Sequence, residues 1–269
     1  QNYISGIETV KKLVDEFDII SGHNCSVGVG IPGFSSKDTE IVTNANSLWL
    51  NNKSFKKDLE IALNRKVKLM NDANCFTLSE ALDGAGKEFK SIFGIIIGTG
   101  FGGGLSYKKE IIEGANQIAG DWGHQPLPYP TNEEIKTKIK CPSSNCGRPL
   151  CAEQFMSGVG FSNIFNIKHN TSFNAEEISK LDNKDDKRAD DEFNLYEDRM
   201  ARLMAVMIGI FDPDAIILGG GMSNIDRLYK NIPPLISKYT FSNKVNTKVL
   251  KNLHGDSSGV RGAAWLWND

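Results

Sequence analysis

The sequence predicts an α/β fold, because segments with helical periodicity alternate with short apolar runs that are typical of strands. Residues 93–97 and 215–218 are near-continuous apolar runs, as expected for strands buried on both faces of a sheet. Each of these runs opens directly into a glycine-rich turn. Buried strands, glycine turns and helices therefore follow one another along the chain.

The first part of the chain alternates helices and strands. Residues 4–17 repeat apolar side chains at helical spacing, and residues 53–64 resemble a second helix. Residues 26–31 alternate small and branched side chains and end at a Pro-Gly pair, which is typical of a strand that enters a turn. Residues 67–70 read as a short strand.

Asn71 and Asp72 stand at the end of that short strand, and residues 73–82 predict the helix that follows. One of the two side chains is therefore expected near the helix N-cap. A carboxylate beside an amide can also bind a sugar hydroxyl and take its proton, which makes Asp72 a candidate general base. The alternative is that Asp72 only caps the helix.

A first glycine turn, Gly98-Thr99-Gly100, separates the strand at 93–97 from a predicted hairpin partner at 102–107. Backbone N–H groups can surround a phosphate where no side chain obstructs them, and Thr99 adds a hydroxyl donor. An ordinary tight hairpin is the alternative. The turn is not a Walker A loop, and a strand rather than a helix follows it, so it is not a Rossmann fingerprint either.

The last part of the chain continues the alternation. Residues 168–192 are rich in charge and predict a solvated helical face or loop, and residues 197–211 predict a strong helix. After the strand at 215–218, residues 228–239 and 262–267 again read as helices.

A second glycine turn, Gly219-Gly220-Gly221, lies between the strand at 215–218 and the next helix. Such a turn lets a nucleotide approach the backbone closely, with its phosphates toward a helix N-terminus. The alternative is a plain strand-to-helix turn. Two such turns in one α/β chain favour nucleotide binding more than either does alone.

Composition and charge exclude several classes of function. The chain has 269 residues, of which 40% are hydrophobic and 24% charged, and a formal net charge of −2. This charge gives no general attraction to nucleic acid or to an anionic membrane, so we expect small-molecule partners. We find no apolar run long enough to span a membrane and no signal peptide, and we expect a cytoplasmic protein. In such a chain, five partly clustered cysteines indicate metal binding and buried thiols rather than a disulfide framework.

Three polar residues, Asp121, His124 and Glu153, are suited to holding vicinal hydroxyls. His124 also forms a possible metal set with the cysteines nearby, and Cys₃His is an accepted ligand set for structural zinc. The thiols concerned are Cys141, Cys146 and Cys151. Thiols unrelated to a metal are the alternative.

Together these motifs resemble the ROK family of sugar kinases and sugar-responsive repressors. The matching segments are residues 28–33, 71–74, 97–100, 121–124, 146–153, 212–224 and 254–264. Within that family, residues 44–51 and 254–267 look most like bacterial fructokinases of the manno(fructo)kinase kind.

The resemblance implies an actin-like, ribonuclease H-like fold of two domains. The smaller domain would cover residues 1–87 and 255–269, and the larger would cover residues 88–254. A hinge is expected near residues 84–86. A homodimer is the family expectation.

The resemblance also implies an ATP-dependent hexose kinase that makes fructose 6-phosphate, with Mg²⁺ bridging the phosphates of ATP and Asp72 as the base. The sugar would be held by Gly33, Asn46, Asn71, Asp121, His124 and Glu153. The nucleotide would lie against Gly98, Thr99, Gly100, Gly219, Gly220 and Gly221. Structural Zn²⁺ would be bound by His124, Cys141, Cys146 and Cys151.

Three features depart from the family pattern. Asp121 stands where the family usually has Glu, and Cys141 lies further from Cys146 than the family's cysteine motif places it. The family's opening Asp-x-Gly-Gly-Thr phosphate turn is absent from this sequence. We interpret the sequence as an N-terminally incomplete form; the alternative is a protein that does not bind ATP in the normal way.

Other functions fit the same motifs. An N-acetylglucosamine kinase or glucokinase would differ only in the hexose. A repressor of the family would bind sugar without phosphorylating it and would carry an added DNA-binding module, and a sugar-binding pseudokinase would lack turnover.

Overall fold

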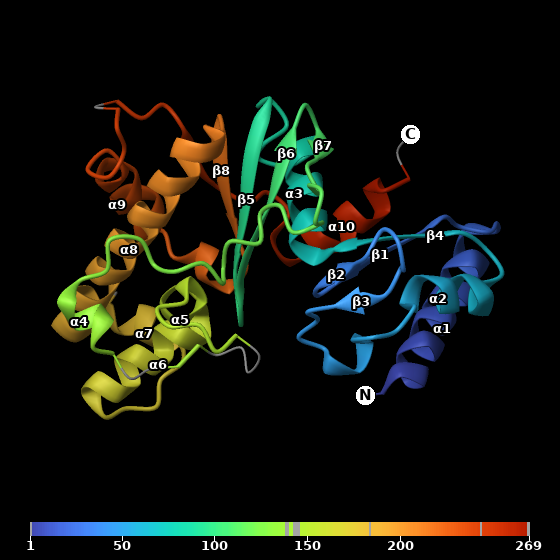
Figure 1. Cartoon of the computed structure of the whole chain (residues 1–269), viewed down its shortest axis with the longest axis horizontal. Coiled ribbons are helices and arrows are strands. Elements are labelled where there is room, and N and C mark those ends of the chain that lie inside the picture. The colour runs from blue at the N-terminus through green and yellow to red at the C-terminus, as the bar shows by residue number, and fades with distance from the viewer. Residues whose placement is uncertain (1, 138–139, 142–145, 183, 243, 268–269) are drawn as a thin grey trace.

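Two lobes lie side by side in the molecule (Figure 1). The computed structural model describes residues 2–137, 140–141, 146–182, 184–242 and 244–267. A two-stranded parallel sheet, β1-β4, lies in the smaller lobe, and a five-stranded sheet lies in the larger one. The predicted α/β class is therefore confirmed.

The smaller lobe is built on β1 (Val27–Ile31) and β4 (Val67–Asn71). Helices α1 (Tyr3–Ser21) and α2 (Phe55–Leu63) share one apolar core with these strands. The parallel register pairs the last residue of β1 with Asn71, so both strands end at the same edge. Shorter elements follow β1: β2 (Phe34–Ser35), β3 (Val42–Thr43) and the 3₁₀ helix η1 (Leu48–Leu50).

The larger lobe is built on a sheet with strand order β7-β6-β5-β8-β9. Its central strand, β5 (Ser91–Ile97), is antiparallel to β6 (Phe101–Tyr107) and parallel to β8 (Ala215–Gly219). The edge strands are β7 (Glu110–Ile111) and β9 (Lys248–Lys251). Since β5 and β8 are parallel neighbours, the glycine turns that follow them leave the sheet at the same edge.

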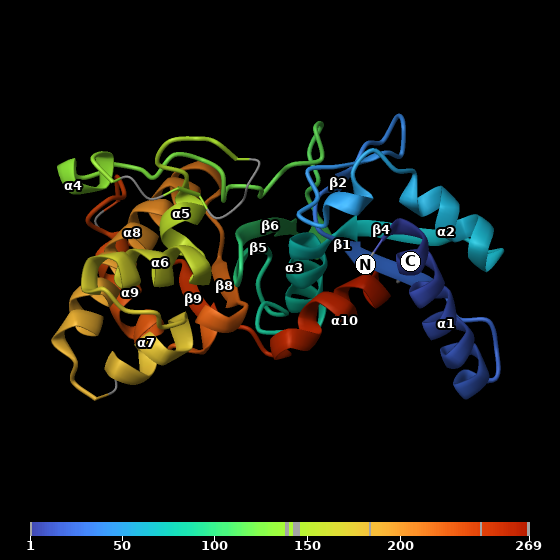
Figure 2. The same cartoon turned by 90° about the horizontal axis from the view of Figure 1, so that it is seen from below.

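Helices cover the face of this sheet that points away from the smaller lobe (Figures 1 and 2). The elements of this layer and of its connections are α4 (Asn132–Ile135), α5 (Ala152–Met156), α6 (Gly158–His169), α7 (Ala175–Asp182), α8 (Lys187–Phe211), η2 (Gly221–Asn224) and α9 (Arg227–Ile236). Their apolar faces and the strands form the largest apolar cluster of the described residues.

Helices α3 (Asp72–Leu82) and α10 (Ser258–Trp265) pack against each other between the two sheets (Figure 2). The short helix η3 (Gly255–Ser257) precedes α10. A Cβ on Gly262 would lie 1.7 Å from the carbonyl oxygen of Cys75, and one on Gly28 would lie 1.9 Å from that of Ala263. Glycine is therefore required where α10 touches α3 and β1.

Most predicted elements match the structure, and the differences have local causes. The helix expected at 228–239 ends at Ile236, just after the Pro233-Pro234 pair that lies within its last turn. The C-terminal helix starts earlier than expected, at Ser258. The charge-rich run at 168–192 holds α7 and the first turns of α8. Most of it faces solvent as predicted, but Ile178, Ala189 and Glu192 are buried.

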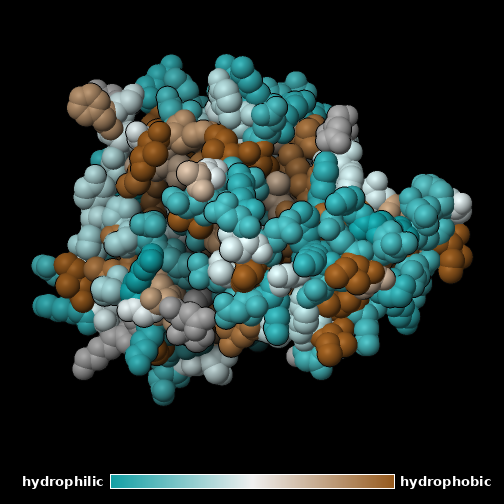
Figure 3. All heavy atoms as spheres, turned by 45° about the vertical axis from the view of Figure 1, so that its right-hand side comes forward, coloured by the Kyte–Doolittle hydropathy of each residue, from teal (hydrophilic) through white to brown (hydrophobic). Residues whose placement is uncertain are grey.

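The surface is mixed in polarity, with separate hydrophobic patches on a largely hydrophilic face (Figure 3). Ile19 and Ile20, near the end of α1, are about 80% exposed (81% and 79%). Scattered exposed apolar side chains are ordinary in globular proteins. Among the described residues, none of the helices combines the length and apolarity needed to cross a membrane.

A buried ion-pair network ties the short helix α4 to α8. Glu134 accepts hydrogen bonds from Arg199 Nε and Arg202 Nη2, both at 2.8 Å, and all three side chains are almost fully buried. Burial alone would raise the pKa of the Glu134 carboxyl, but the hydrogen bonds from Arg202 and Arg199 lower it to about 2. The network therefore anchors the segment that runs from His124 toward Cys141.

We expect Glu134→Ala to lower the free energy of unfolding by about 3 kcal/mol at pH 7, because two buried arginines would lose the carboxylate that they share. Among the described residues, Arg199 would keep only Glu192 as a counter-ion, and Arg202 only Asp198. Since the folded-state pKa is lowered, the stabilisation by Glu134 is present above its unfolded-state pKa and is lost as the pH falls toward 2. Urea unfolding at several pH values measures both effects. Glu133→Ala, at the exposed neighbouring position, is the control, and equal losses in both variants would contradict the account.

Candidate active site

A cavity of about 610 Å³ lies between the lobes. Opposite walls of the cavity carry carboxylates from different helices. Asp72 is the first residue of α3, and Glu153 lies in the first turn of α5. The predicted residues that line it are Gly33, Asn46, Asn71, Asp72, Gly98, Thr99, Gly100, Asp121, His124, Cys146 and Glu153. The structure thus brings the predicted base, sugar-binding group and first glycine turn to one space.

The junction between β4 and α3 fixes the predicted base. Asn71 is the N-cap of α3, because its Oδ1 accepts the N–H groups of Ala73 (3.0 Å) and Asn74 (3.2 Å). The same side chain donates from Nδ2 to the carbonyl of Gly33 at 3.1 Å. Asn71 therefore performs the capping that was one interpretation of Asp72, and the Asp72 carboxylate is left at the cavity wall.

Asp72 is accessible to solvent, yet dense protein surrounds its carboxyl group. Desolvation raises the pKa of Asp72, and a hydrogen bond from the backbone N–H of Ala73 (2.8 Å) opposes the shift. A carboxylate with a raised pKa is a better proton acceptor than an ordinary aspartate. The environment of Asp72 therefore suits a general base.

Gly33 turns the chain from β1 into the cavity rim. Its φ is +88°, and a Cβ there would lie 2.5 Å from the carbonyl oxygen of Thr43. Only glycine fits this left-handed and crowded position. The turn places the Gly33 carbonyl beside Asn71, so the rim and the helix cap hold each other.

The first glycine turn presents bare backbone to the cavity. A Cβ on Gly98 would meet nothing within 4 Å, whereas one on Gly100 would lie 3.0 Å from Glu153 Oε2. The N–H of Gly98 bonds to Gly100 O (3.0 Å), and Gly158 N, at the start of α6, bonds to Gly98 O (2.8 Å). A hydrogen bond from the start of α6 therefore holds the turn, while its backbone faces the cavity. This is the arrangement that a phosphate-binding turn requires.

Glu153 and Asp121 form the acidic part of the wall. Glu153 is 2% exposed, and its Oε2 accepts the N–H of Phe101 at 3.1 Å. The pKa of Asp121 is raised, first by desolvation and further by the charge of Glu153, while His124 and Arg148 oppose the shift. Asp121 has no side-chain hydrogen bond within the described residues, so its oxygens are available to a donor on a ligand.

In the second glycine turn, the reason for glycine differs from one position to the next. A Cβ on Gly219 would lie 2.4 Å from the ring of Phe76, and Gly220 has a φ of +79° with Ile97 O at 2.6 Å from its Cβ position. Gly221 has open space on its Cβ side. These glycines do not line the cavity, and packing accounts for the first two.

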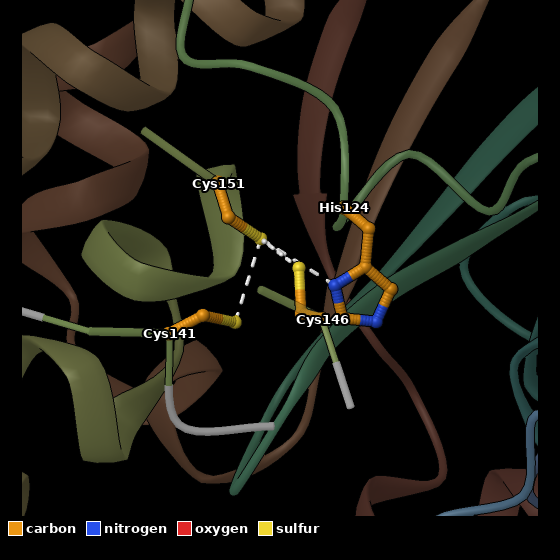
Figure 4. A group of neighbouring side chains, drawn as sticks. All are labelled: His124, Cys141, Cys146 and Cys151. Carbon is orange, nitrogen blue, oxygen red and sulfur yellow. Dashed lines mark hydrogen bonds between the residues drawn. The ribbon is translucent and has the colours of Figure 1, made fainter. Parts of the chain in front are cut away.

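His124 and the three clustered cysteines point toward one another (Figure 4). Cys151 Sγ lies 3.5 Å from Cys141 Sγ, 3.4 Å from Cys146 Sγ and 3.4 Å from His124 Nδ1. All four ligand atoms lie within 4.8 Å of one another. The structure therefore includes Cys141 in the cluster despite its unusual spacing.

The geometry of this cluster fits zinc. Two thiolates at about 2.3 Å from a tetrahedral zinc ion lie about 3.8 Å apart, close to the sulfur separations here. The cluster also joins the cavity wall, because His124 and Cys146 line it and Cys141 Sγ lies 3.5 Å from Glu153 Oε1. An ion here would hold the loop that carries His124 against the start of α5.

Sequence reasoning missed some residues of the cavity wall. Arg148 lines the cavity and donates from Nη1 to the carbonyl of His124 at 3.1 Å. Asn44, which has a φ of +57°, and Gln125 also line it. Their positions beside Asn46, His124 and Cys146 were the only signal that could have indicated them.

The chain is similar to a known protein family and to named members of it. The sequence pattern described as "ROK family" matches residues 1–269. The N-acetyl-D-glucosamine kinase of Vibrio cholerae is 36% identical over 265 residues, which are 98% of this chain and 88% of the relative. That of Aliivibrio fischeri is 34% identical over 266 residues, 99% of this chain and 88% of the relative. These names do not support the predicted preference for fructose, and they favour the alternative of an N-acetylglucosamine kinase.

Solved structures share the fold. The ROK hexokinase from Thermus thermophilus has a TM-score of 0.81 at 21% identity, covering 96% of this chain and 84% of that one. The ROK family glucokinase from Streptomyces griseus, solved with glucose and AMPPNP, has a TM-score of 0.80 at 23% identity, covering 97% and 86%. At such identities the likeness shows the fold alone, and it confirms the predicted actin-like architecture. With the family pattern matched along residues 1–269 and relatives above 30% identity, the chain belongs to the ROK family.

Proposed function

We propose that this protein is an ATP-dependent kinase that phosphorylates N-acetyl-D-glucosamine. The observation that carries the proposal is the placement of Asp72 in one cavity with the acidic pair Asp121 and Glu153 and with an open glycine turn. Membership of the ROK family supports sugar phosphorylation. The names of relatives that cover nearly the whole chain support the choice of hexose.

In the proposed reaction, the Asp72 carboxylate accepts the proton of a sugar hydroxyl. The hydroxyl oxygen forms a bond to the γ-phosphorus of ATP, the bond from that phosphorus to the bridging oxygen of ADP breaks, and ADP leaves. Proton acceptance by a positioned base contributes about 10²- to 10⁴-fold to the rate. The raised pKa of Asp72 suits this role.

The remaining polar residues of the wall would orient the sugar. Asp121 offers free acceptor oxygens, while His124 and Glu153 are fixed by the cysteine cluster and by the Phe101 N–H. Rigid partners of this kind hold a hydroxyl close to the reacting phosphorus, and such positioning is the main source of catalysis in phosphoryl transfer.

The triphosphate would lie against the backbone of Gly98, Thr99 and Gly100, where no side chain other than that of Thr99 obstructs it. The open Gly221 position would border the nucleoside. Mg²⁺ would neutralise charge on the phosphates. The cysteine cluster would hold structural zinc, which stabilises the loop that carries His124.

The choice of hexose is tested on a panel of sugars with coupled detection of ADP, using the full protein. We expect N-acetyl-D-glucosamine to give the highest kcat/KM, with fructose and mannose far below it. A higher kcat/KM for fructose would contradict this choice and would support fructose, the substrate expected from the sequence. Sugar binding without any ADP release would contradict a kinase and would indicate a pseudokinase or a repressor.

The base is tested with Asp72→Asn. We expect kcat to fall by about 10²- to 10⁴-fold, because the amide cannot accept the proton, while calorimetry shows sugar affinity within the range of the wild type. Asp38→Asn removes an exposed carboxylate outside the cavity lining and serves as the control. An unchanged kcat in Asp72→Asn would contradict the role of Asp72 as the general base.

The metal is tested by elemental analysis of the purified protein. We expect about one zinc per chain, and we expect Cys146→Ser to lose most of it, because the site needs all four ligands. Chelation should lower the midpoint of thermal unfolding, since metal binding contributes to folding free energy. Cys25→Ser, outside the cluster, should keep its zinc, and a Cys146→Ser variant with full zinc content would contradict the site.

A further inference from the structure

We propose that Glu80 is a positioning residue that fixes the angle between the two lobes, and with it the distance between Asp72 and the bound nucleotide. The proposal rests on the proposed function and goes beyond it, because Glu80 lies outside the cavity lining and touches neither substrate. Its side chain is 0% exposed, and the reaction as described makes no use of it.

In the part of the chain that the structure describes, the backbone passes between the two sheets twice. The first passage leaves β4 through α3 and reaches β5 by residues 83–90. The second leaves β9 through residues 252–257 and enters α10, which packs on β1. Any rotation of one lobe against the other must bend these two passages.

The carboxylate of Glu80 binds both passages at once. Its Oε2 accepts the N–H of Ala85 at 2.8 Å, from the first passage, and the N–H of Leu253 at 3.1 Å, from the second. Its Oε1 accepts the hydroxyl of Ser258 at 2.7 Å, at the start of α10. One buried side chain on α3 therefore joins the two places where the lobes are connected.

Two glycines allow the first passage to wrap around this carboxylate. A Cβ on Gly84 would lie 2.3 Å from Glu80 Oε2, and one on Gly86 would lie 2.1 Å from the Ile92 side chain. The N–H of Gly86 also bonds to the Glu80 carbonyl at 2.9 Å. The segment expected from the sequence to be a hinge is thus packed against Glu80.

Asn252 continues the connection to the second glycine turn. Its Nδ2 donates to Leu218 O (2.9 Å) and to Ser223 Oγ (3.0 Å), and its Oδ1 accepts the N–H of Gly255 (2.6 Å). Ser223 Oγ in turn donates to Gly220 O at 2.7 Å. Hydrogen bonds and chain continuity therefore lead from Glu80 to the turn that would border the nucleoside.

Helix α3 also connects Glu80 to the proposed base, Asp72. Glu80 lies about two turns after Asp72 on the same helix. Because Asp72 is the first residue of α3 and Asn71 caps this helix, the orientation of α3 sets the position of the Asp72 carboxylate. Glu80 thus links the helix that carries the base to the strand end that carries the nucleotide turn.

The test compares Glu80→Ala, Glu80→Gln and Arg65→Ala for kcat, sugar affinity, unfolding midpoint and radius of gyration. Glutamine can still accept the two backbone N–H groups at Oε1 and can donate to the Ser258 hydroxyl from Nε2. Arg65→Ala breaks the ion pair with Asp18 in the smaller lobe, away from both passages, and controls for a loss of stability alone.

We expect Glu80→Ala to lower kcat by about 10- to 100-fold at a temperature where it remains folded, because small displacements of reacting groups have effects of this size. We expect Glu80→Gln to recover most of the wild-type kcat and Arg65→Ala to keep it. Scattering should give a larger radius of gyration for Glu80→Ala than for the other three proteins.

Unchanged kcat and radius of gyration in folded Glu80→Ala would overturn the proposal, as would an equal loss of kcat in Arg65→Ala. If Glu80→Ala does not fold, Ser258→Ala, which removes one of the three donors, must show a smaller effect in the same directions. A wild type that phosphorylates no hexose would refute the proposed function, and the scattering comparison would still decide the role of Glu80.

Discussion

The structure depends on one strand-to-helix junction, at Asn71. The amide of Asn71 caps α3 through two backbone N–H groups and holds the Gly33 carbonyl, so a single side chain fixes a helix start and a cavity rim. Asn71 supplies the N-cap, and Asp72 adds only one hydrogen bond to the start of the helix, from the N–H of Ala73 to its Oδ1. Its carboxylate is then partly desolvated at the wall of a polar cavity, which is the condition that a general base requires.

The opposite wall depends on close packing and on buried charge. Gly123 has no room for a side chain, since a Cβ would lie 1.7 Å from Phe101 O, and this contact seats the segment before His124 against β6. Glu153 then reaches Phe101 N and approaches Cys141. Further along the loop, Glu134 is bound by two buried arginines of α8. The sugar-facing groups are therefore held by contacts that lie outside the cavity.

The sequence predicted the fold class well because buried strands and glycine turns leave strong local signals. Sequence motifs also indicated residues that share one cavity in the structure, since Asp72, Asp121, His124 and Glu153 all line it. The sequence could not separate glycines that face open space, such as Gly98, from those required by packing, such as Gly219, because that difference depends on neighbours distant in sequence. Arg148 was missed for the same reason. The names of the relatives favour a different hexose from the one expected, and resemblance in short segments does not report the shape of a pocket.

The central claim is that a hexose hydroxyl is held between Asp72 and a triphosphate bound at the first glycine turn. A crystal structure of the full protein with N-acetyl-D-glucosamine and a non-hydrolysable ATP analogue tests it most directly. We predict one sugar hydroxyl within hydrogen-bond distance of the Asp72 carboxylate and in line with the terminal phosphorus, with Asp121 and Glu153 on the other sugar hydroxyls. A sugar bound with Asp72 pointing away from it, or phosphates bound outside the Gly98-Thr99-Gly100 turn, would contradict the account.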